Sequence, residues 1–280
     1  MTSYPNGKLT VATARQGGVR VLAVSLPGQA EELASRHDLG RGARKRAAEG
    51  LVAASLLSAH IKGEERLTLD LQISSPACAG VFEINGDGTV RGRFRPPDVR
   101  DQVELFGFIS VAKSLGAREL YRGIAKIEGE SIEAALQRFL RESQQTDAHV
   151  RLAVDLDADG LVEYADGIFV ERLPHFPKDE FVALVAGMDA DTKRVVDELA
   201  LGLLVGGAID HLGDAALTFL CGCSRDKVSG MIRSLGADEI TAMIAEQDGA
   251  EVVCHFCNEV NRYNAAELAV LRDESGRSDA

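Results

Sequence analysis

The 280-residue sequence is poor in positive charge and has no long apolar run. Its 31 Lys and Arg residues are outnumbered by 43 Asp and Glu residues, which gives a net charge of −12 at pH 7. This balance argues against nucleic acid as a partner, because attraction to a phosphate backbone needs clustered Lys and Arg. The longest uncharged apolar run, Leu199 to Ile209, is about half of a membrane span. We therefore expect neither a nucleic-acid nor a membrane partner.

The sequence also lacks the signatures of secretion and of several enzyme classes. Its first eight residues, Met1-Thr-Ser-Tyr-Pro-Asn-Gly-Lys8, contain no apolar signal core, so we expect a cytoplasmic location. No G-x-S-x-G nucleophile motif, phosphate-binding glycine loop or H-E-x-x-H zinc motif is present. An enzyme is therefore not the expected class.

Cysteine is scarce until the last quarter of the chain. Cys78 alone precedes Cys221, and it lies in Ser-Pro-Ala-Cys-Ala-Gly with no basic or cysteine neighbour. We expect Cys78 to be an inert structural thiol. A chain of this length can form one large and one small domain with a core that needs no disulfides.

The other four cysteines fall in two close pairs. Cys221-Gly-Cys223 is followed by thirty residues and then by Cys254-His-Phe-Cys257. Two thiolate pairs separated by a short insert can converge on one ion and form the tetrahedral shell of a structural zinc site. We predict that Cys221, Cys223, Cys254 and Cys257 bind one zinc ion in the reduced protein. Because four thiolates complete the shell, His255 is expected to be an exposed neighbour.

These cysteine motifs resemble the C-terminal domain of the heat shock protein 33 family, the 33 kDa chaperonins. The family pattern is Cys-x-Cys, about thirty residues and Cys-x-x-Cys, and the single-residue spacing of the first pair distinguishes it from ordinary zinc ribbons. The matching segments are Phe219–Lys227, Glu239–Ile244 and Val253–Glu259, with weaker matches in Leu51–Leu71, Arg91–Gly92, Tyr121–Gly123 and Leu173–Pro174.

The resemblance implies a redox-regulated, ATP-independent holdase chaperone of the bacterial cytoplasm. Such a protein binds unfolded or partially folded clients under oxidative stress and is a homodimer when oxidised. The resemblance also implies the disulfides Cys221–Cys223 and Cys254–Cys257, formed with release of zinc. The residues themselves show only that the site is capable of such oxidation. Metal-bound sulfur is thiolate, which oxidants attack, and each cysteine has a partner close in sequence with which it can form a disulfide.

Two other function classes stay open. The first is a static zinc module that binds protein or nucleic acid. A module that binds nucleic acid would have a basic face, yet Asp and Glu outnumber Lys and Arg between the two cysteine pairs and around them. A thiol–disulfide oxidoreductase using Cys254 and Cys257 would turn over with a reductant, whereas a holdase binds without turnover. A closed shell of four cysteines leaves no open zinc position for catalysis.

The periodicity of apolar residues predicts an α+β fold. We expect a mixed sheet packed with helices in residues 1–174, a helical linker in 175–218, a zinc-binding redox-switch domain in 219–272 and a disordered tail in 273–280. Alternating patterns end at Leu173, and Pro174 and Pro177 then break the chain. The linker helices are expected over 178–187 and 192–205, with an apolar face that rests partly on the zinc domain.

Within the first domain, turn and cap signals set the expected elements. Strands are predicted over 9–14, 19–24, 67–73, 81–84, 89–94, 108–112, 121–127, 150–156, 161–164 and 167–173, and helices over 43–61 and 131–144. Asp155-Leu-Asp-Ala-Asp-Gly160 matches the start of a calcium loop. Alternating residues on both sides favour a hairpin turn there instead.

The zinc domain is expected to contain two helices, a strand and a last helix. Ser224 caps a helix from 225 to 235 that turns Val228, Met231, Ile232 and Leu235 inward. A second helix is predicted over 238–245 and a strand over 251–253. Asn264-Ala-Ala-Glu267 resembles a capping box for a helix that ends at Leu271.

Overall fold

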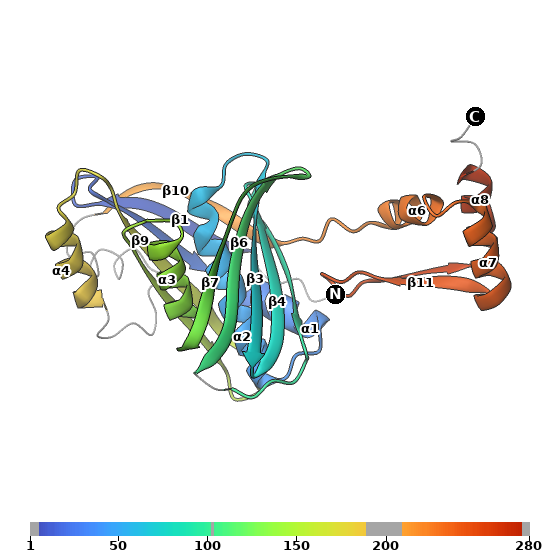
Figure 1. Ribbon diagram of the computed structural model, residues 1–280, viewed down its shortest axis with the longest axis horizontal. Coiled ribbons are helices and arrows are strands. Elements are labelled where there is room, and N and C mark those ends of the chain that lie inside the picture. The colour runs from blue at the N-terminus through green and yellow to red at the C-terminus, as the bar shows by residue number, and fades with distance from the viewer. Residues whose placement is uncertain (1–5, 102–103, 189–208, 276–280) are drawn as a thin grey trace. The chain divides into compact units, whose positions relative to one another are not determined.

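The computed structural model of the protein describes residues 6–101, 104–188 and 209–275 (Figure 1). The chain forms two compact units, Met1–Leu220 and Cys221–Ala280. Sheet and helices are both present, so the α+β class predicted from the sequence is confirmed.

The first unit is built on a ten-stranded sheet of order β7-β6-β3-β4-β5-β10-β1-β2-β9-β8. Neighbouring strands pair antiparallel, except that β5 and β10 run parallel over a short stretch. The strands are β1 (Gly7–Ala14), β2 (Val19–Ser25), β3 (Glu65–Ser75), β4 (Ala77–Asn85), β5 (Thr89–Arg95), β6 (Leu105–Leu115), β7 (Arg118–Glu130), β8 (Ala148–Leu156), β9 (Val162–Arg172) and β10 (Ile209–Phe219).

Five helical segments accompany this sheet in the described residues: α1 (Pro27–Arg36), α2 (Arg41–Leu56), the 3-10 turn η1 (Leu57–His60), α3 (Ile132–Glu142) and α4 (Lys178–Met188). Helix α2 is buried along most of its length. A Cβ atom on its Gly50 would lie 2.2 Å from the Phe82 ring, so glycine permits the close approach of α2 to β4.

Several local predictions are confirmed. The helix predicted over 131–144 is α3: Ser131 caps it by accepting a hydrogen bond from the Ala134 amide, and its buried face consists of Ile132, Ala135, Leu136, Phe139 and Leu140. Strands β8 and β9 are antiparallel neighbours, so 157–161 is a hairpin turn. In that turn the Leu161 amide donates to the Asp157 carboxylate at 2.9 Å, which is the behaviour of a turn aspartate.

Phe82 is the best place to test this core, because its ring is fully buried among glycine positions of α2, β4 and β5. We expect Phe82→Ala to lower the free energy of unfolding by about 3–5 kcal/mol, since it leaves a cavity that rigid neighbours cannot fill. Phe108 on β6 is 49% exposed and provides the matched control. Phe108→Ala should change stability by less than about 0.5 kcal/mol. Urea unfolding of both variants measures the difference, and equal effects would contradict the packing described.

Strand β10 corrects the prediction for the end of the linker. Residues 209–218 were expected to belong to the helical linker and to contain no strand, but Ile209–Phe219 is a strand that pairs antiparallel with β1 from Ile209↔Ala14 to Leu217↔Gly7. Its sequence hardly alternates, so pairing with β1 rather than a local pattern determines its conformation. Strand β9 is therefore not the last strand of the sheet.

The predicted helix over 192–205 and most of the apolar run 199–209 lie outside the described residues.

Helix α4 confirms the first predicted linker helix and shows where its apolar side lies. Phe181, Leu184 and Met188 are buried against a cluster that includes Val21 and Ile168. On β2, Val21 and Ala23 point to the face of the sheet opposite to that of Leu22 and Val24, because side chains alternate along a strand. The described part of the linker thus covers an apolar patch of the first unit.

The second unit contains helices α6 (Arg225–Arg233), α7 (Ala237–Gln247) and α8 (Ala265–Ser275), and the hairpin of β11 (Gly249–Val253) and β12 (Val260–Asn264). Its core is small; the buried members are Val228, Ile232, Ile240, Tyr263, Leu268 and Leu271. The predicted capping box is confirmed, because the Glu267 amide donates to the Asn264 side chain and the Asn264 amide donates to the Glu267 carboxylate.

Two expectations for this unit were wrong. Met231 and Leu235 are 65% and 53% exposed, because α6 turns only the narrow stripe of Val228 and Ile232 toward α7 and α8. Residues 273–275, expected in a disordered tail, continue helix α8. In its last turn, Glu274 forms an ion pair at 2.6 Å with Arg233 of α6. The rest of that tail, 276–280, lies outside the described residues.

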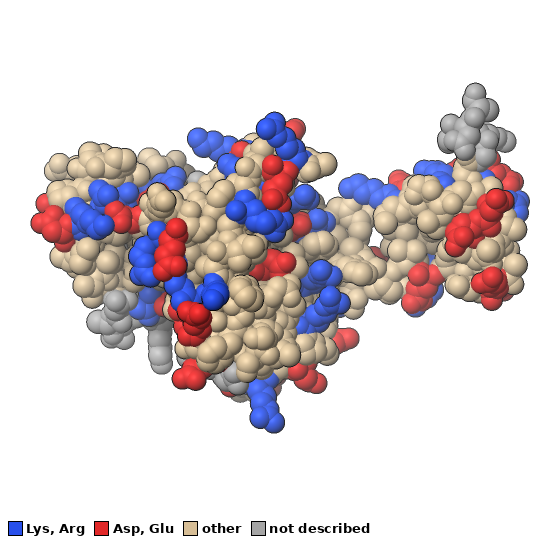
Figure 2. All heavy atoms as spheres, viewed as in Figure 1, with Lys and Arg blue, Asp and Glu red and all other residues tan. Residues whose placement is uncertain are grey.

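Charges of both signs are spread over the surface. On the face drawn in Figure 2, Lys and Arg side chains are interspersed with Asp and Glu. Among the described helices, none combines the length and the apolar character needed to cross a membrane.

Candidate metal centre

The four sulfur atoms of Cys221, Cys223, Cys254 and Cys257 converge in the second unit. All lie within 4.8 Å of one another, and this is the one group of possible metal ligands found among the described residues. Sγ of Cys221 lies 3.6 Å from Sγ of Cys254, and Sγ of Cys223 lies 3.1 Å from Sγ of Cys257. The fold therefore interleaves the two pairs.

The β11–β12 hairpin positions the second cysteine pair. Its loop is closed by the Cys254 amide, which donates to the Glu259 carbonyl at 2.9 Å, and by the Asn258 amide, which donates to the Cys254 carbonyl at 2.8 Å. Asn258 has a φ of +57°, a left-handed conformation that asparagine tolerates better than most residues. The tight loop points both sulfur atoms to one side.

The first pair is positioned by the start of α6. Ser224 accepts a hydrogen bond from the Lys227 amide and caps the helix immediately after Cys223, as predicted. Next to the cap, the Arg225 guanidinium lies 4.3 Å above the Tyr263 ring and donates to Glu267 at 2.7 Å. The Tyr263 hydroxyl donates to the Arg225 carbonyl at 3.0 Å. These contacts join α6 to β12 and α8, and so hold the first pair near the second.

The thiols of this cluster differ in acidity. Burial raises the pKa of Cys223 to about 11 and raises the pKa of Cys257 further. Burial also acts to raise the pKa of Cys254, but the amides of Cys257 and Phe256 donate to its sulfur and, with the neighbouring thiols, lower the pKa to about 7. The hairpin loop thus stabilises a thiolate at Cys254.

The donor set fits zinc. Four sulfur ligands at about 2.3 Å from a central ion would lie about 3.8 Å from each other in a tetrahedron. The Sγ–Sγ distances of 3.1 and 3.6 Å in the structure, and the 4.8 Å within which all four sulfur atoms lie, are within about an ångström of that spacing. A shell of four cysteines is common for structural zinc, whereas Mg²⁺ and Ca²⁺ prefer oxygen.

The other sequence candidates lie elsewhere. Cys78 is buried in β4, and burial raises its pKa to about 11, as expected of an inert thiol. His255 is exposed, as predicted. Of the aspartates in the calcium-like sequence, Asp155 lies in β8 and Asp157 and Asp159 lie in the hairpin turn, and none is part of the four-residue cluster.

Sequence reasoning missed the Arg225–Tyr263 contact. A signal was present, because Arg225 directly follows the cap residue and Tyr263 directly precedes Asn264 of the capping box. Only the fold brings these two residues together, since they are 38 positions apart in the chain.

A ten-stranded sheet in one unit and four converging cysteines in a second define the class of this protein as a two-unit protein with a candidate metal centre, and known proteins are similar to it. The family model described as Hsp33 protein matches residues 7–264. The 33 kDa chaperonin of Enterococcus faecalis is 29% identical and covers 96% of this chain and 97% of its own. That of Bacillus licheniformis is 30% identical, with 95% and 99% covered. The crystal structure of the Thermotoga maritima homologue has a TM-score of 0.85 at 20% identity and covers 99% of this chain and 100% of its own.

The chain belongs to the Hsp33 family. The names of its relatives place it among chaperones rather than enzymes. The resemblance stated from the cysteine spacing is therefore confirmed, and the Thermotoga structure supports the fold alone.

Proposed function

We propose that this protein is an ATP-independent holdase whose binding of unfolded polypeptides is switched on by oxidation of its four-cysteine centre. The observation that carries the proposal is the convergence of four sulfur atoms within 4.8 Å in a unit whose core has six buried side chains. So few apolar residues supply little folding free energy by themselves. A structural zinc ion held by Cys221, Cys223, Cys254 and Cys257 would add on the order of 10–16 kcal/mol.

The thiolates that hold the ion are also the atoms that an oxidant attacks. A thiolate attacks one oxygen of hydrogen peroxide, the O–O bond breaks, hydroxide leaves and the sulfur becomes a sulfenic acid. A second cysteine thiol then displaces that oxygen as water and forms a disulfide. Two such events consume all four ligands, so zinc is released and the unit loses its largest stabilising contribution.

We propose that the disulfides are Cys221–Cys223 and Cys254–Cys257. In the folded unit the short sulfur–sulfur contacts instead join the two motifs, Cys221 with Cys254 and Cys223 with Cys257. The resemblance to the family implies this pairing, and in a loosened chain the entropy of loop closure disfavours cross-pairs between cysteines more than thirty residues apart. A cytoplasmic location would keep the four sulfurs reduced in the absence of stress.

Release of α4 from the sheet would provide the client surface. Phe181, Leu184 and Met188 cover Val21, Ile168 and their neighbours in the first unit. Uncovering a few hundred Å² of apolar surface offers several kcal/mol to an unfolded client, at about 25 cal/mol per Å². The same surface can join two oxidised copies, which is our proposal for the homodimer. We propose the domain boundaries 1–174, 175–218 and 219–272. Within the second range β10 is paired with β1, so only the part before Ile209 can open without breaking the sheet.

The test is light scattering of an unfolding client protein without ATP. We expect the reduced, zinc-loaded protein to leave aggregation nearly unchanged and an equimolar amount of peroxide-treated protein to suppress most of it. Treatment with dithiothreitol plus zinc should restore the first result. Equal suppression by both forms would favour a constitutive binding module, and catalytic turnover of a dithiol would favour an oxidoreductase.

A further inference from the structure

Lys227 is the only lysine of the second unit, and it is the exception among the positive charges described there. Each arginine that the structure describes in this unit forms an ion pair with a carboxylate: Arg225 with Glu267, Arg233 with Glu274, Arg262 with Glu251 and Arg272 with Asp273. Lys227 forms no ion pair with any residue of the described ranges. Its ammonium is therefore an uncompensated positive charge within this part of the chain.

The Lys227 side chain lies against the first cysteine motif. Lys227 is in the first turn of α6, and its amide donates to the Ser224 side chain that caps the helix. Side chains of a helix tilt toward its N-terminus, which here is the end next to the motif. A Cβ atom on Gly222 would lie 3.2 Å from Nζ of Lys227, so the ammonium lies beside the residue between Cys221 and Cys223.

The ammonium is close enough to influence both cysteines of this motif. Neighbouring Cα atoms are about 3.8 Å apart, so the charge acts on Cys221 and Cys223 over a distance comparable to the screening length of about 8 Å at physiological salt. Gly222 is exposed and the two cysteines are half-buried, which lets a small reagent approach them. Four thiolates around a divalent ion would leave a net negative charge, and Lys227 offsets part of it on this side.

The second cysteine motif has a different electrostatic environment. From Glu251 to Glu259 the sequence has a glutamate at each end and no Lys or Arg between them. Arg262, the next cation along the chain, is paired with Glu251 at 2.8 Å. Within the described part of this unit, an anion therefore meets an uncompensated positive charge at the first motif alone.

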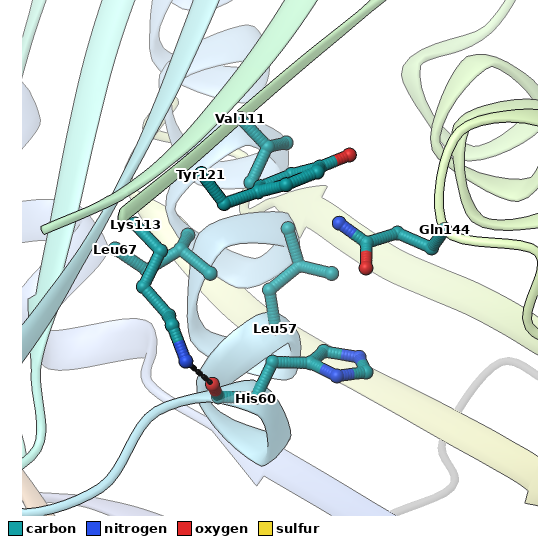
Figure 3. Close-up of a pocket in the computed structure, with 7 residues that line it drawn as sticks. All are labelled: Leu57, His60, Leu67, Val111, Lys113, Tyr121 and Gln144. Atoms are coloured by element: carbon teal, nitrogen blue, oxygen red, sulfur yellow. Dashed lines mark hydrogen bonds between the residues drawn. The ribbon is translucent and has the colours of Figure 1, made fainter. Parts of the chain in front are cut away.

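A lysine of the first unit shows the contrast with a compensated ammonium. Lys113 borders a cavity between η1 and the strands β3, β6 and β7 (Figure 3). Its Nζ donates to the His60 carbonyl at 3.2 Å and lies 3.2 Å from the Glu65 carboxylate. An anion at Lys113 would meet Glu65 at the same place, whereas no carboxylate of the described residues lies within ion-pair distance of Lys227.

We propose that Lys227 makes the Cys221–Cys223 motif reactive toward anionic disulfides and directs them to this motif in preference to Cys254–Cys257. The inference rests on the proposed oxidation of the four-cysteine centre and names a class of oxidant for it. A thiolate of the first motif attacks one sulfur of the reagent, the S–S bond breaks and the other sulfur leaves as a thiolate. The second thiolate of the motif then attacks the mixed disulfide, releases the rest of the reagent as a thiolate and closes a Cys221–Cys223 disulfide. Two electrons thus pass from the protein to the reagent.

Two disulfide reagents that differ in charge test the proposal. Dithiobis(nitrobenzoate) is a dianion and dithiodipyridine is uncharged at pH 7, and the absorbance of each leaving group gives the rate. Both are reacted with the reduced, zinc-loaded full chain and with Lys227→Gln. We expect the substitution to slow the dianion about three- to tenfold, the effect of one unit charge near an exposed site, and to leave the uncharged reagent within about twofold. Equal slowing of both reagents, which a merely structural role would produce, or no slowing of the dianion, would overturn the proposal.

Two further variants separate local charge from fold and net charge. Lys227→Arg retains the charge and should react with both reagents within about twofold of the unsubstituted chain. Arg272→Gln makes the same change in net charge in the last turn of α8 and should also leave both rates within about twofold. The slowing of the dianion in Lys227→Gln should disappear between 0.01 and 1 M salt, because the screening length falls from about 30 to about 3 Å. Slowing by Arg272→Gln as well, or slowing that persists at 1 M salt, would contradict the role of Lys227.

Peptide mapping after a tenth of an equivalent of the dianion, followed by acid quenching and alkylation, locates the first attack. Modified or oxidised cysteine should be mostly Cys221 and Cys223 in the unsubstituted chain, and this share should fall in Lys227→Gln. A majority at Cys254 and Cys257 in the unsubstituted chain would overturn the assignment. Peroxide is uncharged, so zinc release and client aggregation with peroxide-treated Lys227→Gln judge the proposed function separately.

Discussion

Replacing Cys257 by serine is expected to abolish zinc binding and to unfold the second unit. Cys257 is the most buried ligand of the cluster, at 4% exposure, and its sulfur lies 3.1 Å from that of Cys223. Serine offers a neutral hydroxyl in place of a thiolate, so the four-sulfur shell is lost. The six-residue core then lacks the contribution of about 10–16 kcal/mol that zinc supplies to small structural sites.

Metal analysis and amide NMR of the full chain measure this result. The zinc content should fall from one ion per chain to none, and the amides of 221–275 should move to random-coil positions while those of the sheet unit stay dispersed. Cys78→Ser is the matched control, because it removes a buried thiol from β4 and should retain one zinc. Full-affinity zinc binding by Cys257→Ser, or loss of zinc in Cys78→Ser, would contradict the assignment.

Peroxide treatment should have the second large effect. We expect two disulfides, Cys221–Cys223 and Cys254–Cys257, one released zinc ion per chain and a loss of amide protection across 221–275. Helix α4 should lose protection as well, because release of Phe181, Leu184 and Met188 from the sheet is the proposed source of the client surface. The strands that α4 covers should stay protected, since their backbone hydrogen bonds belong to the sheet.

Peptide mapping and hydrogen exchange of the oxidised protein separate this account from its alternatives. Disulfides between Cys221 and Cys254 or between Cys223 and Cys257 would mean that oxidation captures the folded arrangement rather than a loosened chain. An α4 as protected after oxidation as before would exclude it as the covering element, even if zinc has left.

The cluster of four cysteines could be predicted from the sequence because its signals are local. Ligand type, the spacing within each pair and the Ser224 cap are all properties of short segments. The same is true of helix α3, whose apolar stripe has a helical period, and of the hairpin at 157–161. Each of these features depends on a pattern within about a dozen residues.

Other parts depend on contacts between distant residues and could not be predicted in this way. Strand β10 has no alternation of its own and owes its conformation to β1, about 200 residues earlier. Helix α1 was missed because Leu33 is the only large apolar residue it buries, which leaves too weak a stripe to detect. The interleaving of the two cysteine pairs likewise follows from how α6 packs on α8 and β12.

The most direct test of the central claim is to measure zinc release and client aggregation in the same samples while the peroxide dose is raised. A chromogenic chelator reports zinc, and light scattering reports the client. The account predicts that both change together, with suppression of aggregation proportional to the zinc released and reversed by dithiothreitol plus zinc. Full suppression while all four cysteines still hold zinc, or complete zinc release with no gain in suppression, would contradict it.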